Sequence, residues 1–143
     1  MKKLILCVFA VMLAACATKS TPAETLIATD ADLVHHRYDL VAINDQQIET
    51  VDNVRQPRVE FNEGMQISGI VCNSFSGVLT LTDGSYQGMV AATRMACFDE
   101  TLSKAEEVLF KALSTGADFE ITGNEMSITH EGETLHFILN DYK

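Results

Sequence analysis

The sequence predicts an α+β, mainly β fold: a small curved antiparallel sheet or partly open barrel of about seven to eight short strands, closed by one helix. Short segments that alternate apolar and polar residues recur along the chain. Turn signals separate most of them, so neighbouring strands are expected to pair antiparallel. One segment instead has apolar residues at helical spacing. Apolar content of 47% with 21% charged residues excludes wholesale disorder.

The first fifteen residues indicate an export signal. Lys2 and Lys3 supply positive charge, and Leu4 to Leu13 form a short apolar core. The segment Leu13-Ala14-Ala15-Cys16 matches a lipobox, in which the Cys16 thiol takes a diacylglyceryl group. The alternative is an ordinary secretory signal cut near Ala15. On the lipobox we expect a bacterial lipoprotein, which two or three acyl chains would anchor stably in the membrane.

Ala17 follows the lipidated cysteine, which favours the outer membrane, with the domain facing the periplasm. We predict three parts: a signal peptide over residues 1–15, a lipidated flexible tether over 16–29, and one domain over 30–143. Removal of the signal leaves 128 residues, and loss of its two lysines takes the formal net charge from −10 to −12. Such an acidic chain repels phosphate backbones, so no nucleic-acid partner is expected. We expect a monomer held at the membrane by its lipid.

Two cysteines remain after Cys7 leaves with the signal and Cys16 becomes the anchor. In an oxidising periplasm, Cys72 and Cys97 are expected to form a disulfide that closes a loop of 25 residues. Two free buried thiols are the alternative. A redox-active pair is less favoured, because the chain has no Cys-x-x-Cys.

The strands are expected in this order. Thr29 and Asp30 can cap a short helical turn through Leu33. His36, Tyr38, Leu40 and Ala42 then alternate on one face of a strand that ends at the turn Asn44-Asp45. Further strands are expected at 58–61, 65–69, 78–82, 86–90, 118–122, 126–128 and 135–139, joined by turns at 62–64, 83–84, 123–124 and 131–132.

The helical segment carries Leu102, Ala105, Leu109, Ala112 and Leu113 on one face. Ser103 to Glu106 fits a capping box, although Asp99 could cap instead, and Gly116 suits the C-terminal end. The apolar stripe of this helix must be buried, and the inner face of the sheet is the available partner.

Two spaced motifs resemble the META domain family, in its lipoprotein branch. They are residues 67–77 (ISGIVCNSFSG) and 93–97 (TRMAC), and residues 33–40 (LVHHRYDL) resemble the opening of that domain. Val71 and Tyr38 depart from the glycine and tryptophan that the family often has. The resemblance implies a small β-rich fold with one helix, an envelope location, induction under stress and a link to antibiotic tolerance. It implies no catalytic residues.

The motif residues are expected to have structural roles. Positive φ and bonds from side chain to backbone are expected at Asn73 and Gly77, and Met95 is expected to fill a gap beside the disulfide. The full set singled out is Gly69, Asn73, Phe75, Gly77, Thr93 and Met95.

Metal binding and catalysis have little support. His35 and His36 point to opposite faces if the chain is extended. His130 falls on the same face of its strand as the inward residues, whereas His136 falls on the opposite face of its strand. The sequence has no Gly-x-Ser-x-Gly elbow and no P-loop or Gly-x-Gly-x-x-Gly motif. We therefore expect no metal, no cofactor and no enzymatic activity.

The leading functional hypothesis is a stress-related envelope module that binds a protein or another envelope component. A rigid disulfide-bonded domain could also inhibit an envelope-directed hydrolase. The competing hypothesis is a small-molecule binder whose sheet encloses a pocket, motivated by Met65, Phe75, Met89, Met95 and Phe119.

Overall fold

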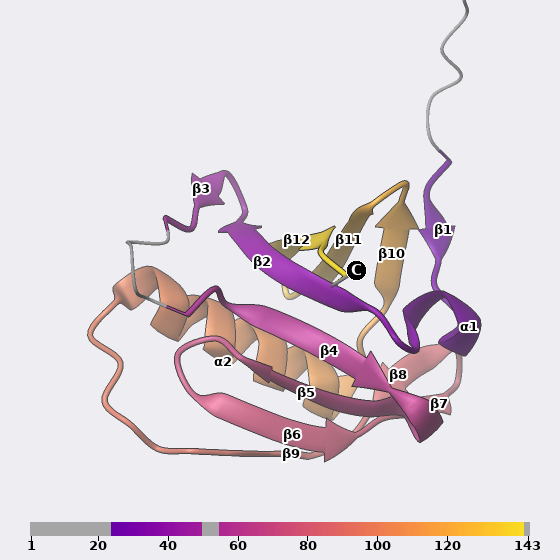
Figure 1. Ribbon diagram of the computed structural model, residues 1–143, viewed down its shortest axis with the longest axis horizontal. Helices are drawn as coiled ribbons and strands as arrows, with labels where there is room; N and C mark the ends of the chain where they lie inside the picture. The colour runs from indigo at the N-terminus through magenta and orange to yellow at the C-terminus, as the bar shows by residue number, and fades with distance from the viewer. Residues whose placement is uncertain (1–23, 50–54, 142–143) are drawn as a thin grey trace, which may run out of the picture.

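The computed structural model describes residues 24–49 and 55–141 (Figure 1). The predicted lipidation site at Cys16, the signal peptide and Cys7 lie outside the described residues. The described residues contain these elements in chain order: β1 (Leu26–Ile27), α1 (Asp30–Leu33), β2 (Arg37–Ile43), β3 (Gln46–Gln47), β4 (Arg58–Asn62), η1 (Glu63–Met65), β5 (Gln66–Ile70), β6 (Ser74–Val78), β7 (Thr80–Thr82), β8 (Ser85–Gln87), β9 (Val90–Ala92), α2 (Glu100–Thr115), β10 (Phe119–Thr122), β11 (Glu125–His130) and β12 (Glu133–Leu139).

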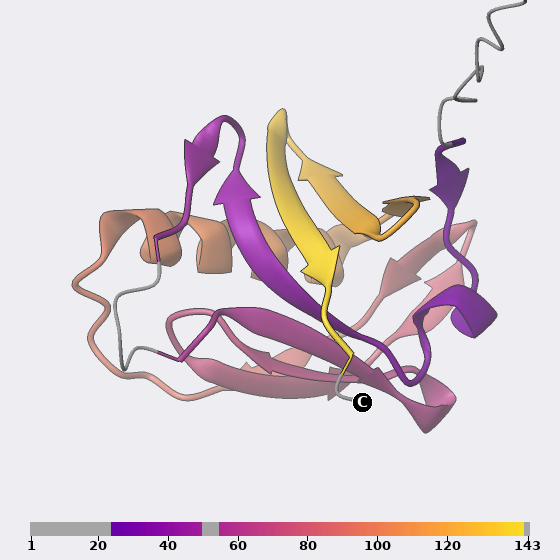
Figure 2. The same cartoon turned by 45° about the horizontal axis from the view of Figure 1, so that its top comes forward.

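The strands form one curled antiparallel sheet and a separate hairpin, which confirms the predicted fold class. The order in the main sheet is β1-β10-β11-β12-β2-β4-β5-β6-β9, with β3 beside β2, while β7 pairs with β8. Figure 2 shows the sheet bent between β2 and β4, so that β10, β11, β12 and β2 stand over β4, β5, β6 and β9. Helix α2 lies between these two walls and fills the half-barrel. No helix among the described residues is long and apolar enough to cross a membrane.

Helix α2 has the predicted buried stripe but begins earlier than the predicted capping box. Ala105, Leu109 and Leu113 are completely buried against the sheet. The N-cap is Asp99, whose carboxylate accepts a hydrogen bond from the Leu102 amide at 3.0 Å, which fits the preference for short acceptors at this position. At the other end, the Gly116 amide donates to the Ala112 carbonyl at 2.9 Å, as expected for a C-terminal glycine.

The core is formed by the inner faces of both walls and by α2. Phe61 and Phe119 are in edge contact, with ring centroids 5.3 Å apart, and Tyr86 lies 5.4 Å from Phe119. Edge-to-face packing of this kind contributes beyond the buried area alone. Met65 and Phe75 are also core residues, at 5% and 4% exposure.

The predicted alternation of β2 fails after Leu40 because the strand contains a bulge. Leu40 is opposite Phe137 on β12, but Ala42 is opposite His136 and Ile43 is opposite Leu135, so Val41 has no partner on β12. An extra residue resets the two-residue period. Ile43 therefore joins the buried cluster, and Ala42 shares the outer face with His136.

Other boundaries also differ from the prediction. The described residues contain twelve strands rather than seven or eight, because several pairings involve only two or three residues. The predicted strand 78–82 is divided at Leu79, which is buried and donates its amide to the Met65 carbonyl at 2.9 Å. The predicted strand 86–90 is divided at Gly88, where a Cβ atom would lie 2.1 Å from the Val78 carbonyl oxygen.

The domain begins earlier than residue 30. Leu26 and Ile27 form β1, which pairs with Ile121 and Glu120 of β10. Ala28 is 5% exposed and donates its amide to the Phe119 carbonyl. The prediction of a tether up to residue 29 is therefore wrong for this segment, because backbone pairing with a sheet edge does not require an alternating side-chain pattern.

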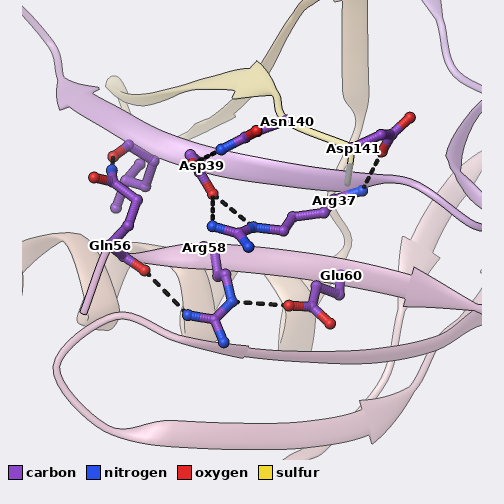
Figure 3. A network of polar contacts seen from close by, with 8 residues as sticks. Arg37, Asp39, Gln56, Arg58, Glu60, Asn140 and Asp141 are labelled. Carbon is purple, nitrogen blue, oxygen red and sulfur yellow. Dashed lines mark hydrogen bonds and ion pairs between the residues drawn. The ribbon is translucent and has the colours of Figure 1, made fainter. Parts of the chain in front are cut away.

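A polar cluster joins the start of β2 to the end of the described chain, and we call it the seam cluster: His36, Arg37, Asp39, Asn140 and Asp141. The Arg37 guanidinium binds Asp39 with two contacts of 2.8 Å, and the Asn140 side-chain amide also donates to Asp39. Asp141 accepts from the Arg37 amide at 3.0 Å and lies 2.7 Å from His36 Nδ1. Figure 3 shows Arg37, Asp39, Asn140 and Asp141 of this cluster beside the ion pair of Arg58 and Glu60 on β4.

Candidate functional site

The two motifs meet at one corner of the molecule, where a disulfide joins Cys72, after β5, to Cys97, before α2. Their Cα atoms are 5.9 Å apart, within the usual range for a disulfide. Between β8 and α2, residues 89–98 run along the lower edge of the molecule, below α2 (Figure 1). We call residues 89–98 the strap; it contains β9 and ends beside the disulfide.

Glu106 of α2 holds this corner together. Its carboxylate accepts hydrogen bonds from the Cys72 amide at 3.0 Å, from the Asn73 amide at 2.5 Å and from the Asn73 side chain at 2.9 Å. A carboxylate that accepts several N–H bonds makes stronger hydrogen bonds than a neutral acceptor would. The helix is thus bound to the loop that follows β5.

Asn73 in turn binds the strap through hydrogen bonds. Its side-chain oxygen accepts from the Met95 amide at 2.7 Å and from the Thr93 hydroxyl at 2.9 Å. The Thr93 amide in turn donates to the Ser74 carbonyl at 3.0 Å. Asn73 is 7% exposed. We call Asn73, Thr93 and Glu106, with the amides of Cys72 and Met95, the corner cluster.

The motif glycines allow close packing rather than unusual backbone angles. A Cβ atom at Gly69 would lie 2.2 Å from the Arg58 carbonyl oxygen and 2.8 Å from the ring of Phe75, its partner on β6. At Gly77 it would lie 2.6 Å from the Met89 carbonyl oxygen. The expectation of positive φ at Asn73 and Gly77 is wrong, since neither is among the described residues with positive φ.

Met95 does not fill a gap in the core, because its side chain is 71% exposed. The other large apolar residues of the strap behave in the same way: Met89 is 88% exposed and Phe98 is 94% exposed. Scattered exposed apolar residues are common on protein surfaces. Here three of them lie on one segment of ten residues, which polar bonds and a disulfide hold in place.

A groove of about 570 Å³ separates the strap from α2. Val90, Ala92 and Arg94 of the strap lie on one side, and Glu106 and Phe110 of α2 on the other. The ring of Phe110 packs edge-on against Phe75, with centroids 5.3 Å apart. The groove therefore has an apolar wall and a cation at one end, and the corner cluster lies beside it.

The four histidines do not come together. His35 is exposed with a φ of 71°, so it is not extended as the sequence argument assumed. His36 belongs to the seam cluster, His130 contacts Glu131 at 3.9 Å, and His136 lines an open hollow of about 560 Å³ over β10 to β12. No group of three metal-ligating side chains occurs among the described residues.

The clearest pKa shift of the core also lies away from the groove. Burial raises the pKa of Tyr86, and so does the hydrogen bond in which its hydroxyl donates to Asp30 at 2.5 Å. This keeps Tyr86 neutral, so its hydroxyl ties the core to the first turn of α1 rather than supplying a base.

Sequence reasoning missed Glu106 as a site residue. It appeared only as part of a capping box, and most carboxylates were expected to be solvated. Its position was informative, because it lies four residues after Leu102 and three before Leu109, at the border of the buried stripe. A carboxylate at such a border is a candidate for a specific partner.

Comparison with known proteins agrees with the motifs. The family model described as META domain matches residues 31–142. The chain is 31% identical over 119 residues to the Heat shock protein HslJ of Escherichia coli (strain K12), across 82% of this chain and 84% of that protein.

Two solved structures share the fold. One NMR structure has a TM-score of 0.71 and 33% identity, covering 80% of this chain and 97% of the other. An NMR structure of a protein from Burkholderia xenovorans has a TM-score of 0.63 at 19% identity, covering 92% and 100%, and supports the fold alone. The family model and the curled sheet built around the two motifs together show that this chain belongs to the META domain family.

Proposed function

We propose that this protein is a non-catalytic binding module of the bacterial envelope, anchored by lipid at Cys16, that binds an envelope protein through its strap. The observation that carries the proposal is the exposure of Met89, Met95 and Phe98 on a segment fixed by the corner cluster. Apolar side chains on a rigid segment lose little conformational entropy on binding, so more of the free energy gained by burying them contributes to affinity.

The position of the strap supports a protein partner over a membrane surface. β1 lies on the upper side of the molecule in Figure 1, and the strap runs along the lower edge. A lipid anchor upstream of β1 would leave the strap facing away from the membrane. The acidic chain, with a formal net charge of −12 once Lys2 and Lys3 are removed with the signal, is also repelled by anionic lipid headgroups.

The same features fit an inhibitor of an envelope-directed hydrolase, since a rigid segment with exposed apolar side chains can occupy a cleft. A sequestering pocket for small molecules is less supported. Of the residues that motivated it, Met65, Phe75 and Phe119 fill the core, while Met89 and Met95 are exposed on the strap. They do not line a common cavity.

Site-specific cross-linking tests the binding role. A photoreactive phenylalanine analogue replaces Met95 or Phe98 in the full chain, and Glu120, exposed on β10, provides the control position. We expect a discrete cross-linked protein from the strap positions and none from Glu120. The same cross-links from Glu120, or none from either strap position, would rule out the strap as the binding surface.

Lipid anchoring is tested separately. Labelling of cells with radioactive palmitate is expected to mark the wild-type protein and not the Cys16→Ser variant, whereas Cys97→Ser should remain labelled. Labelled Cys16→Ser protein would disprove the anchor.

A role under stress is proposed from the name of the related heat shock protein. Transcript levels after heat shock, and the antibiotic sensitivity of a deletion strain, test it. Unchanged values in both would remove the stress and tolerance roles while leaving the binding role intact.

A further inference from the structure

Strand β9 is one of the two ends of the main sheet, and one side of it is open. It pairs with β6 through Val90 opposite Gly77, Ala91 opposite Ser76 and Ala92 opposite Phe75. The Thr93 amide continues this register by donating to Ser74. Because antiparallel pairs alternate, Ala91 shares hydrogen bonds with β6, and the N–H and C=O groups of Val90 and Ala92 point to the open side.

The groove beside α2 lies over the inner face of β9. Val90 and Ala92 share the face of Gly77 and Phe75, which is the inner face of the sheet. Val90 packs at the margin of the core, but Ala92 is exposed even though it lies on the inner face. The small Ala92 side chain leaves room between the strand and Phe110, and the groove of about 570 Å³ is where the inward side chains of a strand added beside β9 would lie.

This edge carries neither charged residues nor proline. Charged side chains and prolines commonly block sheet edges. The segment 88–93 (GMVAAT) has neither. Its outward N–H and C=O groups are therefore available to an extended chain, as in other proteins that bind peptides by adding a strand.

Arg94 lines the groove. The basic side chains of Arg37, Arg58, Lys104 and Lys111 each contact a carboxylate. Arg94 has no such contact among the described residues, although the chain carries twice as many acidic as basic residues. A guanidinium binds a carboxylate with two parallel hydrogen bonds where the geometry allows.

We propose that the edge of β9 and the facing side of α2 take an extended segment of a partner protein as an additional strand, with an acidic side chain or C-terminal carboxylate of that segment against Arg94. The inference rests on the proposed binding function and specifies the kind of segment that is bound. Alternate side chains of the segment would point into the groove toward Phe110.

Peptide selection tests this. Random linear heptapeptides displayed on phage are selected on the full chain, purified in detergent, and counter-selected on the Ala92→Pro variant. Proline removes the outward N–H of residue 92 but none of the amides that bond to β6. We expect selected peptides that alternate apolar and polar residues and carry an acidic group, and that bind the wild type at least about tenfold more tightly than Ala92→Pro.

Charge reversal keeps the test valid if the proline variant is unstable. A selected peptide is expected to bind Arg94→Glu about tenfold more weakly. Arg55→Glu makes the same charge change at an exposed arginine that does not line the groove, and should bind like the wild type. Replacing the acidic residue of the peptide by lysine should restore binding to Arg94→Glu.

Peptides that bind both groove variants as tightly as the wild type, or no selected peptides at all, would overturn strand addition at β9. The cross-links from Met95 and Phe98 would separate the two proposals. If they persist while peptide binding fails, the strap still binds a protein by another geometry. If both fail, the binding function falls as well.

Discussion

Two polar clusters, one at the middle of the curled sheet's strand order and one near its β9 end, differ in what they cover. The seam cluster joins β2 to the C-terminal segment, and its Arg37 and Asp39 are each 9% exposed. The corner cluster also buries its central side chain, Asn73, but the strap that it holds keeps Met95 and Phe98 exposed. The seam cluster therefore closes the fold, whereas the corner cluster fixes a surface.

The comparison shows that burial of polar groups alone does not distinguish structural from functional positions. Both clusters satisfy their polar groups, and the described residues contain no buried side-chain polar atom without a partner. The difference lies in the neighbours, because only the corner cluster adjoins an open sheet edge and exposed apolar residues. Substitutions in each cluster should separate stability from presentation of the strap.

Disruption of the seam cluster is expected to have the largest effect on the free energy of unfolding. Asp39→Ala removes the carboxylate that Arg37 and Asn140 bind, and should lower the free energy of unfolding by about 3 kcal/mol or more, since breaking a buried ion pair leaves a buried charge. Denaturant unfolding measures this. Glu60→Ala, which breaks the more exposed pair with Arg58, should cost about 1 kcal/mol or less. Equal losses would show that the seam is no more than a surface contact.

Removal of the disulfide should have the next largest effect. The Cys72→Ser, Cys97→Ser double variant frees a loop of 25 residues, and should lose about 3 kcal/mol on the chain-entropy account. Amide hydrogen exchange is expected to speed up in the strap and to stay slow in β2 and β12. If exchange rises equally in both regions, the corner is not an independent unit.

Glu106→Gln should loosen the strap at a smaller cost. It replaces a charged acceptor of three N–H bonds by a neutral one, which should cost about 1–2 kcal/mol and speed amide exchange at Met95. Glu107→Gln, on the adjacent position of α2, affects only an exposed pair with Lys111 and should leave the exchange unchanged. The idea that Glu106 fixes the strap fails if the two variants behave alike.

The smallest effect on the free energy of unfolding is expected at acid pH. The hydrogen bond from the Arg37 amide holds the pKa of Asp141 below its usual value, and His36 adds to this. Asp141 therefore stabilises the fold above the unfolded pKa of about 3.9, and this contribution is lost as pH falls through the lower folded pKa. The difference in unfolding free energy between the wild type and Asp141→Asn should shrink over that window. A difference that is constant with pH would show that the carboxylate charge plays no part. The effect is small because the Asp141 side chain is 37% exposed.

Much of the fold followed from local signals in the sequence. The turn at Asp83-Gly84 has positive φ at both residues and joins Thr82 to Ser85, as the hairpin signal predicts. The sequence also predicted helix α2, its buried apolar stripe and its C-terminal end at Gly116. These features depend on neighbouring residues, so the chain reveals them without knowledge of its tertiary contacts.

The bulge at Val41 and the partners of Glu106 could not be predicted in the same way. The bulge depends on how β12, almost a hundred residues later, is placed against β2. Glu106 meets Asn73 across 33 positions in the sequence. The motifs identified Asn73 and Thr93 as important, but not that together they hold a strap with exposed apolar side chains.

The sequence by itself determined the fold class, the family resemblance and the pair of cysteines available for a disulfide. The tertiary structure decided which polar residues are buried, which strand is left at the sheet edge and which apolar side chains remain exposed. The physical reason is range: turns, caps and periodicity are set within a few residues along the chain. Exposure at the strap depends instead on how α2 and the two walls of the sheet pack around one core.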